Sequence, residues 1–402
     1  MISLSYLKYN SANRPKTRAM NERERLLTVL AGGVADRIPW YADLSWWYDA
    51  HRSRGDFLDS YKDPIDSHPS YRSHFQLVPT DGSGYLRLHQ DTGVGIYFYA
   101  PMVWTEQYSA NIHIIVEQQE NLITSRIITP VGELESISQY LPESFTSAYK
   151  TYYIKKPEDL KVMQYIWTHR EVRPNYGEFV RVSTLWNGAG VAFSLSPIST
   201  AALQTLMSRW AGIETTINLI YDAPELFDDT VNVLQSADDE IFEIISSSPA
   251  QVVEFPDNIS GQVSGKNLLR KYVLPYWIKR VKQLQQSGKY VGVHNDGGVK
   301  AALPIIIEAG FDFVEAVTPE PVGDISLEQI NQLAEGNIVV IGGLPGAFFS
   351  PLYSTKYFEQ FIKAVLQVYS DKPGFVLGVA DQVPPDAELE RICLVRDVLE
   401  NQ

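Results

Sequence analysis

The feature of this 402-residue chain that most limits its fold is a repeat of strand and helix patterns in the second half. Short apolar runs, typical of buried parallel strands, alternate there with longer helical patterns. The clearest runs are residues 251–255, 290–294, 311–315, 337–341 and 375–379. A glycine stands shortly before four of them, where a helix C-cap is expected: Gly288, Gly310, Gly336 and Gly374. No glycine-rich dinucleotide-binding fingerprint opens any of these units, so we expect an α/β fold, a (β/α)8 TIM barrel rather than an open sheet.

We expect a single domain, because 402 residues suit one barrel with insertions. Residues 1–19 are polar and irregular and form an N-terminal arm. The barrel then occupies residues 20–402 and starts with a helix that Asn21 caps, with acidic residues in its first turn. Residues 42–150 are rich in Tyr, Trp, Gly and Pro, and their alternating segments predict a β-rich insertion that covers one end of the barrel.

The charge balance restricts the partners of this chain. The net charge is -14 and the acidic residues are spread along the sequence, so neither nucleic acid nor a membrane is an expected partner. The one cysteine, Cys393, excludes an internal disulfide and a thiolate-rich metal site. Residues 1–19 contain no apolar run long enough for a signal peptide, so we expect a cytoplasmic protein.

The carboxyl ends of the predicted strands carry the candidate site, because β/α barrels place their active sites there. Side chains alternate in direction along a strand. In residues 290–296, Val291 and Val293 suit the side that packs on helices. His294 and Asp296 are therefore expected to face the barrel interior together, just before a glycine pair that allows a tight turn.

The same alternation predicts further carboxylates at this end. On the next strand it directs Val314 outward and both Phe313 and Glu315 inward. On the last strand it directs Val376 outward and both Leu377 and Asp381 inward. Asp257, just after the run at 251–255, is a further candidate for a catalytic carboxylate, together with Glu315.

One imidazole and three carboxylates are thus expected to meet: His294, Asp296, Glu315 and Asp381. Buried carboxylates this close cannot all stay ionised without compensation. A divalent cation would supply it, since histidine with carboxylates is a normal ligand set for Zn, Mn or Fe. An isolated His-x-Asp is more often a hydrogen-bonded pair, and its place at a strand end, beside acids that end two other strands, is what favours a metal site.

Two aromatic clusters can wall a pocket for a flat or methylated ligand, although such clusters more often serve packing. They are residues 46–48, which include Trp46 and Trp47, and residues 97–99, which begin with Tyr97. With Asp43, these three aromatic residues are the expected substrate-binding side chains.

Seven segments, in order, add a resemblance to one known family. They are residues 21–39 with Asp36-Arg37-Ile38-Pro39 at the end, Thr129-Pro130-Val131-Gly132, residues 257–276, residues 294–297, residues 315–324, Gly342-Gly343-Leu344-Pro345 and Pro384-Pro385-Asp386. Together they resemble the uroporphyrinogen decarboxylase superfamily from about residue 20 to the C-terminus. The ordered set is far more specific than any one of its members.

The resemblance is closer to the cobalamin-dependent methyltransferase branch than to the true decarboxylases. The true decarboxylases carry an arginine-rich motif after the first strand, whereas residues 41–47 contain no arginine. The methyltransferase branch holds zinc with a His-x-Cys pair and a later cysteine before Pro-Pro. Here His294 is retained, and Asp296 and Asp381 stand where the two cysteines would be. The resemblance therefore implies a metal site of these three residues, with Zn, Mn or Fe, and Glu315 as a fourth ligand or acid–base group.

Three functional hypotheses follow. The first is a metal-dependent methyltransferase-like enzyme that methylates a metal-activated thiol or hydroxyl of a small molecule. For it, the resemblance implies a corrinoid, carried by a partner protein, as the methyl donor. The second is a decarboxylase (a lyase) for a smaller or less anionic substrate, with Asp257 or Asp43 near the reacting ring. The third is a non-catalytic barrel that binds a corrinoid or a partner protein. Independently of these three hypotheses, the resemblance implies a homodimer.

Overall fold

Eight parallel strands close around a common axis in the computed structural model of the chain, which describes residues 19–56, 58–62, 82–99, 102–197, 200–369 and 372–401. They are β1 (Trp40–Asp43), β2 (Ile96–Tyr99), β9 (Gly190–Leu195), β10 (Val252–Phe255), β11 (Tyr290–His294), β12 (Phe313–Val317), β13 (Val339–Pro345) and β14 (Phe375–Gln382). Parallel pairings join them in the order β1-β14-β13-β12-β11-β10-β9-β2. A parallel bridge between Tyr41 and Gly95 then brings β2 back beside β1. The ring follows the chain order, so the predicted TIM-barrel fold is confirmed.

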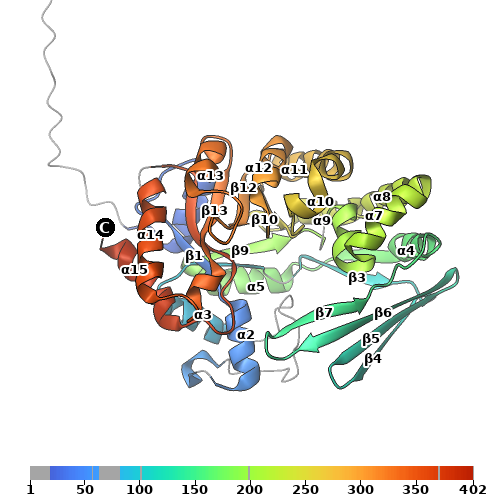
Figure 1. Cartoon of the computed structure of the whole chain (residues 1–402), viewed down its shortest axis with the longest axis horizontal. Helices are drawn as coiled ribbons and strands as arrows, with labels where there is room; N and C mark the ends of the chain where they lie inside the picture. Colours follow the sequence, from blue (N-terminus) through green and yellow to red (C-terminus); the bar gives the residue numbers. More distant parts are fainter. Residues whose placement is uncertain are drawn as a thin grey trace, which may run out of the picture.

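Helices follow the strands and cover the outside of the barrel (Figure 1). The α-helices are α1 (Glu22–Leu30), α2 (Ser45–Arg54), α3 (Ser83–Thr92), α4 (Asp159–Thr168), α5 (Gly177–Trp186), α6 (Ala202–Thr205), α7 (Gly212–Asp222), α8 (Pro224–Ala237), α9 (Asp239–Ser247), α10 (Gly261–Leu268), α11 (Leu274–Gln286), α12 (Val299–Ala309), α13 (Leu327–Ala334), α14 (Thr355–Tyr369) and α15 (Leu389–Glu400). Short 3-10 segments are η1 (Asp59–Tyr61), η2 (Asn187–Ala189) and η5 (Gly346–Phe349), and π-helical turns are η3 (Leu206–Trp210) and η4 (Leu269–Val273). None of the helices in the described ranges is both long and apolar enough to cross a membrane.

The barrel interior is filled with apolar side chains below the site. An aromatic layer of Tyr41, Tyr97, Phe193 and Phe313 has ring centroids 5.6–6.3 Å apart between neighbours. Below this layer, Leu26 and other apolar residues of α1 join the same core. Because the interior is packed, polar groups that face inward are confined to the carboxyl end.

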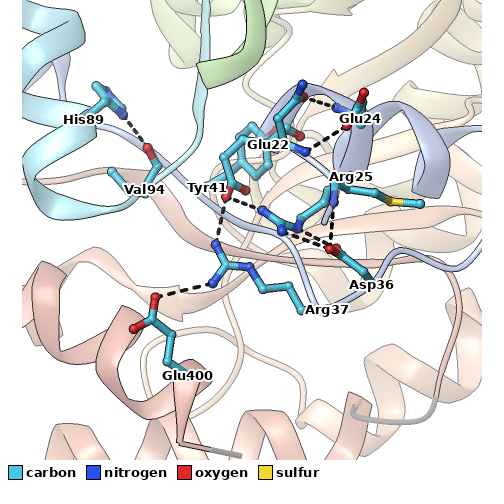
Figure 2. A network of polar contacts seen from close by, with 11 residues as sticks. Glu22, Glu24, Arg25, Asp36, Arg37, Tyr41, His89, Val94 and Glu400 are labelled. Carbon is cyan, nitrogen blue, oxygen red and sulfur yellow. Dashed lines mark hydrogen bonds and ion pairs between the residues drawn. The ribbon is translucent and has the colours of Figure 1, made fainter. Parts of the chain in front are cut away.

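The first helix closes the amino end of the barrel, and ion pairs fix it there (Figure 2). Asn21 caps α1 as predicted, since its side chain accepts from the Glu24 N–H and Glu24 bonds back to the Asn21 N–H. Arg25 pairs with Asp36 at 2.7 Å, which ties the helix to the turn before β1. The Tyr41 hydroxyl donates to a backbone carbonyl of the same helix, so the barrel floor and its plug form one unit.

An insertion of antiparallel sheets leaves the barrel after β2 and returns at α5. Its strands are β3 (Trp104–Tyr108), paired with β8 (Arg170–Pro174), and the four-stranded sheet β4 (His113–Gln119), β5 (Leu122–Thr129), β6 (Gly132–Leu141) and β7 (Thr146–Thr151). Within residues 42–150, the described part before β3 forms α2, η1, α3 and the barrel strand β2. Since the insertion starts at the carboxyl end of β2, it emerges on the same side of the barrel as the candidate site.

The imidazole of His89 in α3 is buried and lies beside the carbonyl group of Val94 (Figure 2). Its Nδ1 lies 3.2 Å from the carbonyl oxygen of Val94, and its Nε2 has no hydrogen-bond partner within the described residues. Burial lowers the pKa of His89 from its ordinary 6.5 to about 3. A protonated ring would bury a charge and an unsatisfied N–H in the same place.

We expect the free energy of unfolding to fall as the pH drops from 6.5 toward 3, because the unfolded chain then binds a proton that the folded chain excludes. At pH 4 the cost from His89 is about 3 kcal/mol, from roughly 1.36 kcal/mol per pH unit below the ordinary pKa. His89→Leu should therefore lose less stability than the wild type between pH 7 and pH 4, measured by urea unfolding at each pH. Equal losses in the two proteins would contradict this.

Candidate metal centre

Charged side chains gather where the barrel strands end. On β11 and β12, Val291, Val293 and Val314 pack in the helix-side core, and Phe313 packs in the barrel interior, all as predicted. Because side chains alternate along a strand, the residue after each outward-facing valine points into the barrel. These residues are His294, after Val293 on β11, and Glu315, after Val314 on β12. These two residues are direct cross-strand neighbours in the parallel pairing of β11 and β12.

A hydrogen-bonded chain runs from Tyr97 through Glu315 to His294. The Tyr97 hydroxyl donates to Glu315 Oε1 at 2.7 Å, and His294 Nδ1 lies 2.5 Å from Glu315 Oε2. Tyr97 and Glu315 are almost completely buried, and the His294 side chain is 13% exposed. With Nδ1 held by a carboxylate, the imidazole is fixed in orientation and its Nε2 faces away from Glu315.

Asp381 reaches the imidazole by a route that the alternation did not predict. Val376 lies in the barrel interior and Leu377 in the helix-side core, so the predicted directions of these side chains on β14 are wrong. The register of β14 against β1 shifts just before Gln382, and Asp381 itself has a φ of 69°. The irregular backbone breaks the alternation, and Asp381 Oδ1 lies 3.6 Å from His294 Nε2.

Glu254 on β10 is a member of the cluster that the sequence reasoning missed. It is completely buried, and neither carboxylate oxygen has a hydrogen-bond partner within the described residues. Each of Glu254, His294 and Glu315 offers a ligand atom within 4.8 Å of those of the other two. The signal was available, because Glu254 is the single charged residue in an apolar strand and shares the direction of Val252, which lies in the barrel interior.

Asp43 ends β1 beside this cluster and is held by two polar neighbours. Its Oδ1 accepts from the Ser45 N–H at 2.7 Å, and its Oδ2 accepts from Gln382 Nε2 at 2.8 Å. Gln382 and Ser45 were also missed, because a glutamine and a serine far apart in sequence carry no local signal. Burial raises the pKa of Asp43 to about 6, with a further contribution from the charge of Glu315, although the hydrogen bonds lower it.

Two other predicted carboxylates make no hydrogen bond or ion pair with this cluster in the described residues. Asp257 is completely buried, and its oxygens accept from the Ala201 N–H at 2.9 Å and from Trp277 Nε1 at 2.6 Å. These bonds tie the loop after β10 to α6 and α11, which gives Asp257 a structural role in this arrangement. Asp296 is exposed and lies two residues after the end of β11.

The two tryptophans predicted for substrate binding make packing contacts. Trp47 is 5% exposed and its indole N–H donates to the carbonyl of Ala387 at 3.1 Å. Trp46 packs against a small core that includes Tyr140 and Phe145 of the insertion. Together they fix α2 between the loop before α15 and the four-stranded sheet. Tyr97, the third predicted aromatic residue, lies in the barrel and contacts Glu315.

The acidic groups at the mouth shift one another's pKa values and that of His294. Burial disfavours the imidazolium, but the surrounding carboxylates, Glu315 foremost, outweigh it and raise the pKa of His294 to about 10. Burial raises the pKa of Asp381 to about 7 even though His294 lowers it. Burial and the charge of Glu315 raise the pKa of Glu254 well above its usual range. One imidazolium therefore does not compensate the carboxylates around it, and the donor set fits a divalent cation.

Comparisons with known proteins agree with the fold. The family model of uroporphyrinogen decarboxylase (URO-D) matches residues 189–401, just over half of the chain. A methyltransferase from Methanosarcina mazei is similar in structure with a TM-score of 0.59 and 11% identity, covering 95% of this chain and 99% of that one. A B12-independent methionine synthase from Shewanella sp. W3-18-1, in complex with selenomethionine, has a TM-score of 0.36 and 10% identity over 79% of this chain and 84% of its own. No curated protein matches the sequence.

Proposed function

The chain belongs to the uroporphyrinogen decarboxylase family, and from this premise we propose that it is a metal-dependent, methyltransferase-like enzyme. Its cation would bind at the carboxyl end of the barrel, at the imidazole of His294. The acceptor of the methyl group would be a thiol or hydroxyl of a small molecule. Zinc is the first expected metal, with manganese or iron as alternatives, because nitrogen and carboxylate oxygen ligands suit all three.

The observation that carries this proposal is the group of buried carboxyl groups around one imidazole. Asp43, Glu254, Glu315 and Asp381 influence one another's charge states, and His294 is the one cationic group in direct contact with the cluster in the described residues. Both oxygens of buried Glu254 also have no hydrogen-bond partner there. A barrel without a cation has little reason to bury such a set, since each unpaired carboxylate destabilises the fold.

The hydrogen bonds favour His294 Nε2 as the atom that binds the cation. Histidines that bind metals usually donate the other ring N–H to a carboxylate, and Nδ1 is held by Glu315 in this way. Asp381 Oδ1, 3.6 Å from Nε2, would be a second ligand. Asp296, exposed and two residues after His294 in the sequence, would complete the set that the resemblance implies. Tyr97, by holding Glu315, would fix the imidazole indirectly.

A bound cation would lower the pKa of an acceptor's thiol or hydroxyl and so prepare it for methylation. The side chains of the chain would orient the acceptor and receive its proton. Burial raises the pKa of Asp43 to about 6, which is close enough to neutral pH for its carboxylate to take up that proton. Gln382 holds one of its oxygens in place. We further propose a corrinoid on a partner protein as the methyl donor, on the strength of the sequence resemblance.

The direct test is a metal analysis of the purified protein. We expect about one divalent ion per chain, and loss of methyl transfer from methylcobalamin to a thiol acceptor after treatment with a chelator. Restoring the metal should restore the activity. Activity that persists in metal-free protein would contradict the proposal, and so would carbon dioxide release from uroporphyrinogen without methyl transfer, which is the outcome expected of a decarboxylase.

A further inference from the structure

The outer strand of the insertion, β4, has an edge that no strand of the described chain covers. It pairs on one side with β5 and is the first strand in the order β4-β5-β6-β7. In Figure 1 it lies at the outer margin of the sheet, with β5 and β6 between it and β7. All seven of its residues are exposed, including Ile114 at 48%, Ile115 at 40% and Val116 at 62%. An edge with this many exposed apolar residues is a template for pairing with another strand.

The opposite edge of the same sheet, β7, differs in the features that protect edges. It contains Lys150, and its pairing with β6 has a register shift between Ile137 and Ser138. Lysines and bulges both hinder the addition of a strand. In contrast, β4 contains no lysine or proline, and its pairing with β5 runs without interruption from His113 to Gln119. The two edges therefore form a natural comparison within one sheet.

The exposed side chains of β4 continue an apolar face that is buried elsewhere in the sheet. Ile114 lies opposite Ile127 on β5, and Ile127 lies opposite Leu134 on β6. Ile127 and Leu134 are buried in the main core, to which α4 also contributes. At Ile114 and Val116 the same apolar face reaches the edge of the sheet, where it is exposed to solvent. Whatever pairs with β4 must extend this apolar face.

The sequence of β4 is complementary to itself in one antiparallel register. If a two-fold axis passes through Ile115, Ile114 lies opposite Val116 of the partner and His113 lies opposite Glu117. Every aliphatic residue then meets an aliphatic residue, and the two titratable side chains of the strand meet each other. Within the described residues neither His113 nor Glu117 has an ion-pair partner. An axis through Val116 instead sets Ile115 opposite Glu117, which is a poor match.

We propose that β4 pairs with β4 of a second copy of this chain, about a two-fold axis at Ile115, so that the two four-stranded sheets become one. A two-fold axis between identical strands gives an antiparallel pair and a closed dimer, which protects the edge in both copies. A strand pair buries less surface than a standard interface, so we expect dissociation on the order of micromolar concentrations. This interface is independent of the proposed chemistry in the barrel.

The test is the mass of the full chain in solution across that concentration range, measured by sedimentation velocity. We expect twice the monomer mass of 45.4 kDa at high concentration and a monomer on dilution. Ile115→Lys places two ammonium groups opposite each other and should weaken the dimer at least 10-fold. Ala148→Lys, at an exposed position on β7, is the matched control and should leave the dimer unchanged. Circular dichroism and thermal unfolding would verify that both variants are folded.

A charge exchange tests the register itself. Glu117→Lys sets a lysine opposite His113 and His113→Glu sets two carboxylates against each other, so each change alone should weaken the dimer. The double variant restores opposite charges and should recover the wild-type mass at the same concentration. A wild-type chain that stays monomeric at all concentrations would overturn the proposal, as would a dimer that tolerates Ile115→Lys. Equal weakening by Ala148→Lys, or no recovery in the double variant, would equally overturn it.

Discussion

Replacing His294 with alanine is expected to remove stoichiometric metal from the purified protein and to abolish methyl transfer with it. Two contacts support the expectation: Nδ1 lies 2.5 Å from Glu315 and Nε2 lies 3.6 Å from Asp381. The imidazole is therefore the group that joins the two carboxylates, and its loss leaves them unconnected. Mutation of a residue that only hydrogen-bonds to a metal ligand typically weakens metal binding by about 10- to 100-fold. Loss of the proposed ligand itself should weaken metal binding by more than that.

The measurement is metal content per chain by elemental analysis, followed by titration of the chelator-treated protein with zinc. His113→Ala, which removes an exposed imidazole on β4, is the matched control and should retain the full metal content. Asp381→Asn distinguishes the roles of the two ring nitrogens of His294. It should weaken metal binding at Nε2 and leave the contact between Nδ1 and Glu315 in place. Full metal occupancy in His294→Ala would remove the proposed site, although the barrel would remain.

The sequence predicts the second half of the barrel well because its signals are local. Each strand from β10 to β14 overlaps a predicted apolar run, and positive-φ glycines such as Gly310 and Gly374 lie before the strands as expected. The strands β2 and β9 were not identified. Four-residue β2 lies in an aromatic segment without clear alternation, and the partner that defines it as a barrel strand, β9, is far away in the sequence. Pairing over such distances leaves no trace in a short window.

The candidate site separates what alternation can predict from what it cannot. On β11, and on β12 as far as Val314, the pairing is regular, so counting by two correctly assigns Val293, Val314 and Phe313 to their sides. On β14 the count fails, because a register shift and the positive φ of Asp381 reverse its direction after the regular part of the strand. Asp381 therefore approaches His294 for a reason that the sequence does not contain. Glu254 was missed because the prediction placed the catalytic carboxylate after the strand, at Asp257, and not within it.

Replacing Glu254 with leucine is expected to stabilise the metal-free protein while weakening its metal binding. The carboxyl group is completely buried and has no hydrogen-bond partner within the described residues. Its burial and the charge of Glu315 raise its pKa well above the usual range, so the fold carries the cost of an uncompensated acid. Removing such a group should raise the free energy of unfolding by about 1–3 kcal/mol in chelator-treated protein.

The opposite effect on function follows from the same carboxyl group. Glu254 is one of the three residues whose ligand atoms lie within 4.8 Å of one another, so it contributes negative charge that a dication would compensate. Its loss should lower the affinity for zinc by about 10- to 100-fold. Asp257→Leu is the matched control, because both Asp257 oxygens accept hydrogen bonds and their removal leaves buried donors unsatisfied. Urea unfolding of the metal-free proteins should therefore show Glu254→Leu more stable and Asp257→Leu less stable than the wild type. Destabilisation by both changes would mean that Glu254 supports the fold, and the argument for a cation from its burial would fail.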